Sequence, residues 1–444
     1  MEFDHFCKNG VIVKIPVNNL QKLINSGTYE EKESAFSKKT HFHKKRVVCL
    51  ATVKEVTDNY AIVKLPKYLT PYLFKQKKYT IDITDNIVLH EQQTDYFKLL
   101  KNTLKEKQGC CLNLKPGTGK TVLAIKLMSF LKLKTVIIVH KEFLRDQWID
   151  SIVKFTNINR DDIGLIQGKT EELDKPVTIC MLQTLWKKER LNISYNLLIV
   201  DEVHNIGADA FFKSLTNALP ICKYTLGLSG TTDRVDGMSP LFEAYLGKII
   251  KPVTENNTKI HLIKHYLSSD SDEYKVKINK RTGTIDTVNM TTALANYEPR
   301  TRYIFEVTKK YLDQQVLILS DRISFLDRLS SLLQSENITF TCNYGKNRTY
   351  KSNNNGIILA TFSMASEAFD VQDLNVLILA SSISSQNKFI QSVGRINRNS
   401  EINKSKKILV DIIDEPLKHQ SRKRDKLLYS NFIIHIDNTL SCNL

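Results

Sequence analysis

Three short groups of residues could together bind and hydrolyse a nucleoside triphosphate. The first is Pro116-Gly117-Thr118-Gly119-Lys120-Thr121, which lies between the apolar run 110–112 and a helical pattern at 122–131. A glycine-rich turn at the start of a helix exposes backbone N–H groups, and the helix dipole favours an anion there. We therefore expect phosphates at this turn, with Lys120 reaching the β- and γ-phosphates and the Thr121 hydroxyl on Mg²⁺. The strict spacing of such a loop has glycine at position 114, where this chain has leucine.

The second group is the acidic pair Asp201-Glu202, which directly follows the apolar run Leu197–Val200. Ligands of open α/β sheets bind at the carboxyl ends of the strands, so this pair is expected at such an edge. Asp201 is suited to hold Mg²⁺, and Glu202 to orient and deprotonate an attacking water. An acidic pair after a strand can instead begin a helix, but together with Lys120 and Thr121 it completes a hydrolytic set.

The third group is a pair of arginines, Arg395 and Arg398, three residues apart in a helical pattern. At this spacing both side chains project from one face of a helix. They could reach a γ-phosphate, where an arginine is worth roughly 10³–10⁵ in rate in nucleotide hydrolases. The alternative is a surface helix with salt bridges.

The elements needed to position these groups are visible from about residue 85 onward. Short apolar runs alternate with longer amphipathic stretches, which is typical of βαβ units with parallel strands. The pattern occurs twice and predicts an α/β protein with two parallel sheets in tandem. The runs are Val136–Val139, Val177–Met181, Leu197–Val200 and Tyr224–Leu228 in the first series, and Val316–Leu319, Gly356–Ala360, Val376–Ala380 and Ile408–Val410 in the second.

Two further segments have different patterns. Residues 1–84 show β-like alternation and predict a small β-rich accessory domain. Its basic residues, among them the run Lys44-Lys45-Arg46, suggest that this domain binds nucleic acid, with a solvated basic face as the alternative. Residues 254–299 predict a linker or hairpin insertion with a turn at Lys280-Arg281-Thr282-Gly283, which could be a strand-separating wedge or a plain β-turn. The predicted sheet domains are then 85–253, which binds the nucleotide, and 300–444.

With these residues assembled, the chain resembles the superfamily 2 helicases over residues 85–415. The segments GTGKT and DEVH resemble motifs I and II of that family, and Ser229-Gly230-Thr231-Thr232 resembles motif III. The resemblance implies two RecA-like domains. It implies further that Gln93 is the glutamine that reads adenine. It also implies that hydrolysis is coupled to domain movement through His204, Ser229, Gly230, Thr231 and Gln391.

Other motifs of the family imply contacts to the nucleic acid. Residues 140–148 and Gln183-Thr184 resemble motifs Ia and Ic, Ser320-Asp321-Arg322 resembles motif IV, and the segments 361–370 and 391–398 resemble motifs V and VI. The implied nucleic-acid-binding residues are His140, Lys141, Gln183, Thr184, Ser320, Arg322 and Thr361. Asp370 is expected to contact the nucleotide.

Within the superfamily, the forms QSVGRINR and GLSGTTDR are most similar to the XPB-type group, which includes phage branch-migration helicases of the UvsW type and a poxviral transcript-release helicase. The implied activity is ATP- and Mg²⁺-dependent remodelling of branched DNA, such as forks and four-way junctions, in replication, recombination or repair. ATP would bind between the two sheets. Two alternatives stay open: a motor acting on RNA or a transcription complex, and a nucleic-acid-binding protein that uses ATP only as a switch.

The charge composition agrees with a nucleic-acid partner. The 444 residues carry 64 Lys and Arg against 47 Asp and Glu, a formal charge of +17, which favours a polyanion. No apolar run approaches the ~20 residues of a membrane helix, so we expect a soluble protein. We further expect a monomer that acts in the cytoplasm, that of the host if the protein is of phage origin. The eight cysteines show no metal-ligand spacing, and we expect no structural zinc.

Overall fold

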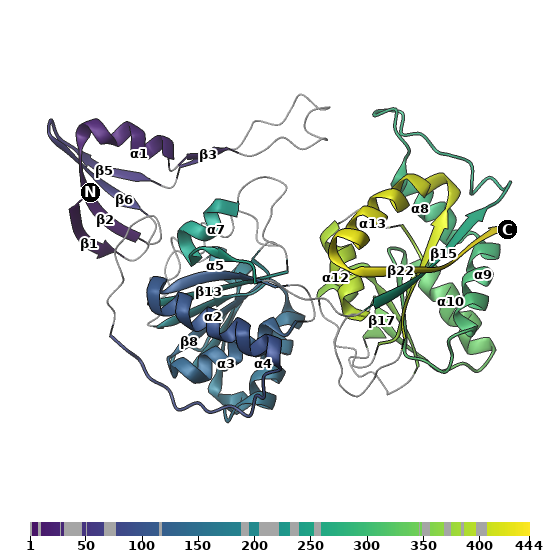
Figure 1. The fold of residues 1–444 in the computed structure, drawn as a ribbon, viewed down its shortest axis with the longest axis horizontal. Helices are drawn as coiled ribbons and strands as arrows, with labels where there is room; N and C mark the ends of the chain where they lie inside the picture. The colour runs from purple at the N-terminus through teal and green to yellow at the C-terminus, as the bar shows by residue number, and fades with distance from the viewer. Residues whose placement is uncertain are drawn as a thin grey trace. The chain divides into compact units, whose positions relative to one another are not determined.

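The computed structural model describes most of the chain. The described residues are 2–7, 10–26, 28–30, 47–49, 51–65, 77–114, 118–187, 195–203, 222–230, 239–252, 259–345, 347–348, 356–367, 374–382, 386–396 and 406–444. They divide into two compact units, Met1–Thr254 and Glu255–Leu444. Each unit contains one eight-stranded sheet, drawn in Figure 1.

The first unit begins with a small antiparallel sheet of order β1-β2-β6-β5. Alternate residues of β6 are buried against β2, because side chains of a strand point to opposite faces in turn. This confirms the β-rich character predicted for the N-terminal segment. Its elements are β1 (Glu2–Cys7), β2 (Gly10–Pro16), η1 (Val17–Asn19), α1 (Leu20–Ser26), β3 (Thr28–Glu30), β4 (Val47–Cys49), β5 (Thr52–Val56) and β6 (Tyr60–Leu65).

The larger sheet of the first unit has the order β10-β9-β11-β8-β12-β13-β7-β14. All neighbouring pairs are parallel except β10 with β9. Its strands are β7 (Gly109–Asn113), β8 (Thr135–Val139), β9 (Ile163–Gln167), β10 (Thr170–Glu171), β11 (Val177–Met181), β12 (Leu197–Val200), β13 (Tyr224–Ser229) and β14 (Ile249–Ile250). Its helices are α2 (Glu91–Lys107), α3 (Lys120–Leu131), α4 (Glu142–Phe155), η3 (Arg160–Asp162), α5 (Leu182–Lys187) and α7 (Ser239–Leu246).

Helices cover both faces of this sheet, which explains why its strands are apolar throughout. Cys110 packs with α2, α3 and α4 on one face, whereas the adjacent Cys111 packs with α5 and α7 on the other. The same division separates Ile137 from Ile138. The continuous apolar runs in the sequence are therefore strands buried on two sides.

The second unit contains a sheet of order β18-β17-β19-β16-β20-β21-β15-β22, in which only β17 and β18 pair antiparallel. Its strands are β15 (Lys259–Ser268), β16 (Val316–Ser320), β17 (Phe340–Tyr344), β18 (Asn347–Arg348), β19 (Ile357–Thr361), β20 (Val376–Leu379), β21 (Lys407–Asp414) and β22 (Ile433–Asn443). Its helices are α8 (Thr287–Asn296), α9 (Glu298–Lys309), α10 (Ile323–Ser335), α11 (Phe362–Glu367), α12 (Gln386–Ile396), η6 (Glu415–Leu417) and α13 (Lys418–Asn431). The α/β class with two tandem parallel sheets is confirmed.

The prediction of a linker over residues 254–299 was wrong for the first part of that range. Strand β15 lies there, and it pairs with β21 on one side and with β22 on the other. The turn at 280–283 is present, since Ile278 and Ile285 form a bridge and Gly283 has a φ of 63°. The remaining domain boundaries stay a prediction. None of the helices in the described residues has the length and apolar composition needed to cross a membrane.

Candidate functional site

The glycine-rich turn joins the carboxyl end of β7 to the first turn of α3, as predicted. Gly119 precedes the helix with a φ of 86°, a left-handed conformation that glycine adopts without strain. The Lys120 Nζ lies 3.3 Å from the backbone oxygen of Leu114 and donates to it. Leu114, which departs from the usual motif, is buried in the core of the sheet, and its N–H donates to the oxygen of Ser229. Leucine here anchors the start of the turn.

Gln93 lies against this turn. Its Nε2 donates to the backbone oxygen of Thr118 at 3.2 Å, while its Oε1 accepts from the N–H of His90 at the start of α2. A Cβ at Gly119 would lie 2.4 Å from the Gln93 Nε2, so a larger residue at position 119 would displace the end of the Gln93 side chain from its present position. The structure thus brings the predicted adenine-reading residue beside the predicted phosphate turn.

The acidic pair lies at the carboxyl end of β12, two strands from β7. Asp201 is buried, and its two oxygens accept hydrogen bonds from Trp148 Nε1 at 2.8 Å and from the N–H of Glu202 at 2.9 Å. Burial and the neighbouring Glu202 carboxylate raise the pKa of Asp201 to about 6, although the Trp148 bond and Lys120 oppose the rise. A carboxylate held in this way is stabilised by any cation that reaches it.

Glu202 has an unusual backbone conformation with a φ of 46°. Two other described residues with positive φ, Gln108 and Lys132, are C-caps of helices, where a left-handed residue is common. Glu202 instead follows a strand, and such conformations cluster at functional sites because the surrounding structure must hold them in place.

Strand β13 connects these two groups. It lies between β12 and β7, and Ser229 at its end aligns with Asn113 just before the glycine-rich turn. Ser229 is buried, with Gly230 following it at the sheet edge. The end of β13 therefore lies next to the start of the turn.

The donor set suits a magnesium nucleotide. The Asp201 carboxylate and the Thr121 hydroxyl are hard oxygen ligands of the kind Mg²⁺ prefers, and each carboxylate oxygen can accept more than one contact. Lys120 and the N-terminus of α3 supply positive charge for phosphates. When bound, the ion would neutralise phosphate charge at the end of β12.

The nucleic-acid-binding residues predicted in the first unit lie at the ends of β8 and β11, which are neighbours in the sheet. The Gln183 Nε2 donates to the backbone oxygen of His140 at 2.5 Å. Lys141 is the N-cap residue of α4. The Thr184 side chain is buried and accepts from the N–H of Gly168, so it positions a loop. These four residues form one cluster at the sheet edge.

The corresponding residues of the second unit lie at the ends of β16 and β19. Ser320 is fully buried, and its hydroxyl accepts from the N–H of Arg322. The Arg322 guanidinium donates to the Thr292 hydroxyl and to the backbone oxygen of Val288, both on α8. The Thr361 hydroxyl accepts from the N–H of Met364 in the first turn of α11.

Gln391 and Arg395 lie four residues apart on α12 and are both buried. Six of the predicted site residues fall outside the described residues, namely Pro116, Gly117, His204, Thr231, Asp370 and Arg398.

The chain is similar in sequence to known proteins. The family described as "Type III restriction enzyme, res subunit" matches residues 74–234. A protein of Acanthamoeba polyphaga mimivirus named "Putative ATP-dependent RNA helicase L396" is 32% identical over 399 residues, which cover 83% of this chain and 74% of that protein. The "DNA 3'-5' translocase XPB2" of Sulfurisphaera tokodaii is 24% identical over 376 residues, covering 74% of this chain and 82% of that protein.

The chain belongs to the superfamily 2 helicases. A structure titled "The fragment structure of a putative HsdR subunit of a type I restriction enzyme from Vibrio vulnificus YJ016" shares the fold, with a TM-score of 0.53 and 16% identity over 81% of this chain and 70% of that one. The helicase is an ATP hydrolase that acts on nucleic acid. Membership of this helicase family disagrees with the alternative hypothesis, in which ATP is only a switch and is not turned over.

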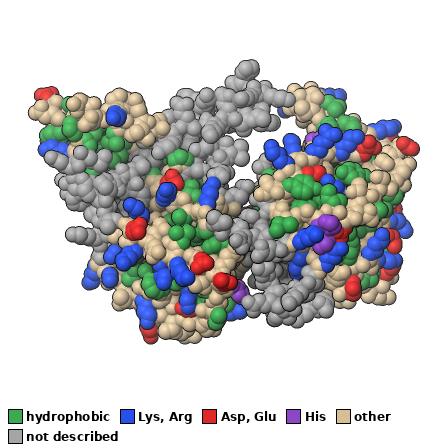
Figure 2. Space-filling model, in the orientation of Figure 1, with side chains coloured by type: hydrophobic (Ala, Val, Ile, Leu, Met, Phe, Trp, Pro, Cys, Tyr) green, Lys and Arg blue, Asp and Glu red, His purple; other side chains and the backbone are tan. Residues whose placement is uncertain are grey.

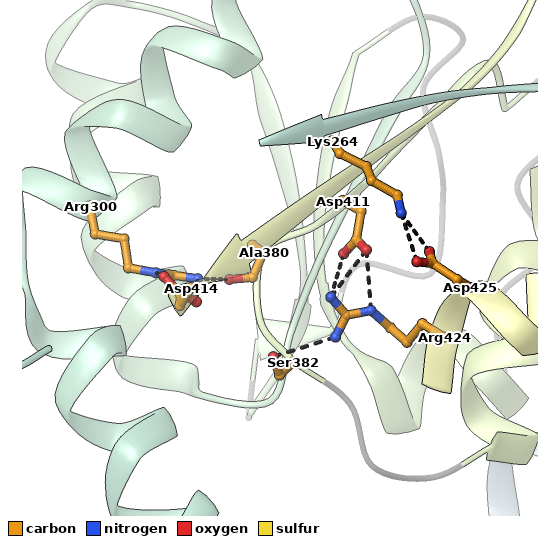
Figure 3. A network of polar contacts seen from close by, with 8 residues as sticks. All are labelled: Lys264, Arg300, Ala380, Ser382, Asp411, Asp414, Arg424 and Asp425. Atoms are coloured by element: carbon orange, nitrogen blue, oxygen red, sulfur yellow. Dashed lines mark hydrogen bonds and ion pairs between the residues drawn. The ribbon is translucent and has the colours of Figure 1, made fainter. Parts of the chain in front are cut away.

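Two further sets of charged residues in the helicase were not predicted from the sequence. The first is a buried network in the second unit, drawn in Figure 3. Arg300 donates to both oxygens of Asp414 at 2.6 and 2.9 Å and to the backbone oxygen of Ala380. Arg424 makes a similar forked contact with Asp411. These pairs join α9 and α13 to the ends of β20 and β21.

The second set is the exposed face of α13, where Lys418, Arg422 and Lys426 lie four residues apart and Lys423 is adjacent to Arg422. Figure 2 shows Lys and Arg side chains gathered over this helix on the face drawn. The sequence signal for this basic surface is the run KHQSRKRDK, in which five of the nine residues are Lys or Arg. Such a surface suits a phosphate backbone.

Proposed function

We propose that the helicase is an ATP-driven DNA translocase that remodels branched DNA, regressing forks and migrating four-way junctions in replication, recombination or repair. Gln93 would read adenine, Lys120 would bind phosphate, and Thr121 with Asp201 would hold Mg²⁺. Glu202 would activate water, and Arg395 and Arg398 would contribute positive charge to the hydrolysis of ATP. The predicted cluster at the ends of β8 and β11 would follow the strand backbone. We also propose that it acts as a monomer in the cytoplasm.

The proposal of a branched substrate rests on the hairpin of the second unit. Ile278 and Ile285 pair, Asn279 and Thr284 close the turn, and Lys280 and Arg281 are exposed at its tip. An exposed basic tip can hold a duplex at the point where its strands part. The relative named as a DNA translocase supports DNA as the track.

Energy also favours remodelling over plain unwinding. Separating a base-pair step costs a mean of about 1.4 kcal/mol, whereas exchanging one duplex for another is nearly balanced. A motor that exchanges pairs at a junction needs only to bias a balanced reaction. Moving along a backbone through phosphate contacts makes that reaction independent of sequence.

The test compares ATPase and strand-exchange rates on forks, four-way junctions, linear duplexes and RNA–DNA hybrids. We expect junctions and forks to be processed faster than linear duplexes of equal length. Lys120→Ala should abolish every ATP-dependent rate. A preference for linear duplexes would contradict the proposal.

The hairpin has its own matched comparison. Replacing Lys280 and Arg281 by alanine should slow junction processing while leaving ATPase stimulated by single-stranded DNA unchanged. Lys275→Ala is the control, because Lys275 is an exposed lysine of the same segment that pairs with Asp272. Equal loss in both variants would mean that general charge, and not the hairpin tip, accounts for the effect.

A second candidate is a helicase that acts on RNA. It is favoured by the relative of Acanthamoeba polyphaga mimivirus, whose printed name is that of an RNA helicase. It predicts that RNA stimulates the ATPase at least as strongly as DNA of the same length, and the substrate panel above decides between the two.

A further inference from the structure

Two histidines and an aspartate meet at the surface of the second unit. His261 lies on β15, and His435 and Asp437 lie on β22. The His261 Nδ1 is 2.8 Å from Asp437 Oδ1, and the His435 Nε2 is 3.5 Å from the same oxygen. One ligand atom from each residue lies within 4.8 Å of the others, and no second group of this kind occurs among the described residues.

The sheet fixes this arrangement. β15 and β22 run parallel with His261 aligned to His435, so both imidazoles stand on the same face. The pairing shifts register between Leu262 and Ile263, which leaves Asp437 as the extra residue of a bulge on β22. Bulges redirect side chains, and here the Asp437 carboxylate turns to both histidines.

The donor atoms suit a transition-metal ion. In a tetrahedral site with bonds of about 2.0–2.2 Å, ligand atoms lie roughly 3.3–3.6 Å apart. The separation of 3.5 Å between Asp437 Oδ1 and His435 Nε2 matches this spacing. The 2.8 Å between Asp437 Oδ1 and His261 Nδ1 is a direct hydrogen bond, which must lengthen when an ion enters. Two imidazoles and one carboxylate are donors that Zn²⁺ accepts readily, whereas Mg²⁺ prefers oxygen alone. The His435 side chain is half-exposed, so water can supply a fourth ligand.

Lys406 completes the surroundings. Its ammonium contacts the other carboxylate oxygen, Asp437 Oδ2, and leaves Oδ1 to the histidines. Hydrogen bonds to the second oxygen of a ligating carboxylate orient it toward the metal.

We propose that His261, His435 and Asp437 bind one Zn²⁺ ion, or a transition-metal ion of the same ligand preference, and that this ion fastens β22 to β15. Among the described strands, β22 is at the edge of its sheet and pairs with β15 alone. The ion adds a side-chain link to the backbone ladder at the bulge, where the ladder is interrupted. Figure 2 shows histidine side chains at the surface over these strands, beside Lys and Arg side chains.

The first test is calorimetric titration of the chelator-treated full chain with ZnCl₂, without ATP or Mg²⁺. We expect one ion per chain and at least a tenfold loss of affinity in His261→Ala, His435→Ala and Asp437→Asn. His419→Ala is the matched control, because His419 is an exposed histidine of the same unit on α13, and its affinity should equal that of the parent. Circular dichroism confirms that each variant is folded.

The second test is amide hydrogen exchange of β22 with and without Zn²⁺. If the ion binds only when the strand is paired, free Zn²⁺ at 100 times its dissociation constant should slow β22 exchange about 100-fold. His261→Ala should show no slowing. Absence of stoichiometric binding, or binding that the three variants leave unchanged, would overturn the site. Binding without slower exchange would overturn the fastening role.

Discussion

The hydrogen bond from Trp148 to Asp201 should set the lower pH limit of ATP hydrolysis. Asp201 serves as a metal ligand only as a carboxylate, and burial raises its pKa to about 6. The Trp148 indole opposes that rise by donating to Oδ2 at 2.8 Å from a buried position. Trp148→Phe keeps an aromatic ring in the core and removes this one donor.

The size of the effect follows from the charge on the acceptor. A hydrogen bond to a charged group contributes about 1.5–3 kcal/mol, and one pKa unit corresponds to about 1.36 kcal/mol. Loss of the bond should therefore raise the pKa of Asp201 by about one to two units. Activity is present above this pKa and is lost as pH falls through it, so the acid limb should move from about pH 6 toward pH 7–8.

The assay is DNA-stimulated ATPase from pH 5 to 9 at limiting Mg²⁺. Raising Mg²⁺ should return the limb toward its original position, because the cation favours the ionised carboxylate. Trp186→Phe is the matched control, since the chain has two tryptophans and Trp186 is exposed. An acid limb that stays in place in Trp148→Phe, or that moves equally in the control, would refute the assignment.

Three further predictions concern stability, the nucleotide turn and DNA affinity. Arg300→Met should lower the free energy of unfolding by about 3–5 kcal/mol, because it leaves the buried Asp414 carboxylate without its partner. The control is Arg302→Ala on the same helix, which breaks an exposed pair worth under about 1 kcal/mol. Chemical denaturation measures both changes. Gly119→Ala should weaken nucleotide binding at least tenfold by fluorescence titration, since the left-handed φ of 86° strains a residue with a Cβ and that Cβ would displace the end of the Gln93 side chain. Replacing Arg422 and Lys426 by alanine should reduce the slope of log affinity for DNA against log salt by about 1.4–1.8, and an unchanged slope would mean that α13 does not contact phosphates.

The strands and helices that position the site could be predicted because each forms from residues that are close together in the sequence. A run such as Leu197–Val200 is apolar throughout because helices cover both sides of its sheet, and it became β12 with the same bounds. The acidic pair and the glycine-rich turn follow such runs directly. Their meeting at one edge is a consequence of parallel pairing, so their proximity could be inferred before the structure.

Contacts between distant residues could not be inferred in this way. Arg300 lies in a helix with polar neighbours, and nothing near it shows that its partner is Asp414 on β21. His261 and His435 were not predicted as metal ligands for the same reason. The expectation of no structural zinc rested on residues that lie close together in the sequence. Trp148 fell within a recognised motif, but its bond to Asp201 depends on how α4 packs against β12.

The position of β15 between β21 and β22 has a consequence for synthesis on the ribosome. The first sheet can close once β14 has emerged, but β15 must wait for a neighbour that begins at Lys407, about 140 residues after Ser268. At about 5–20 residues per second this interval lasts roughly 7–30 s. During that time the residues of β15 that will be buried, such as Ile260 and Leu262, have no strand beside them. Chains truncated before β21 should therefore be prone to aggregation, whereas the first unit should already be folded.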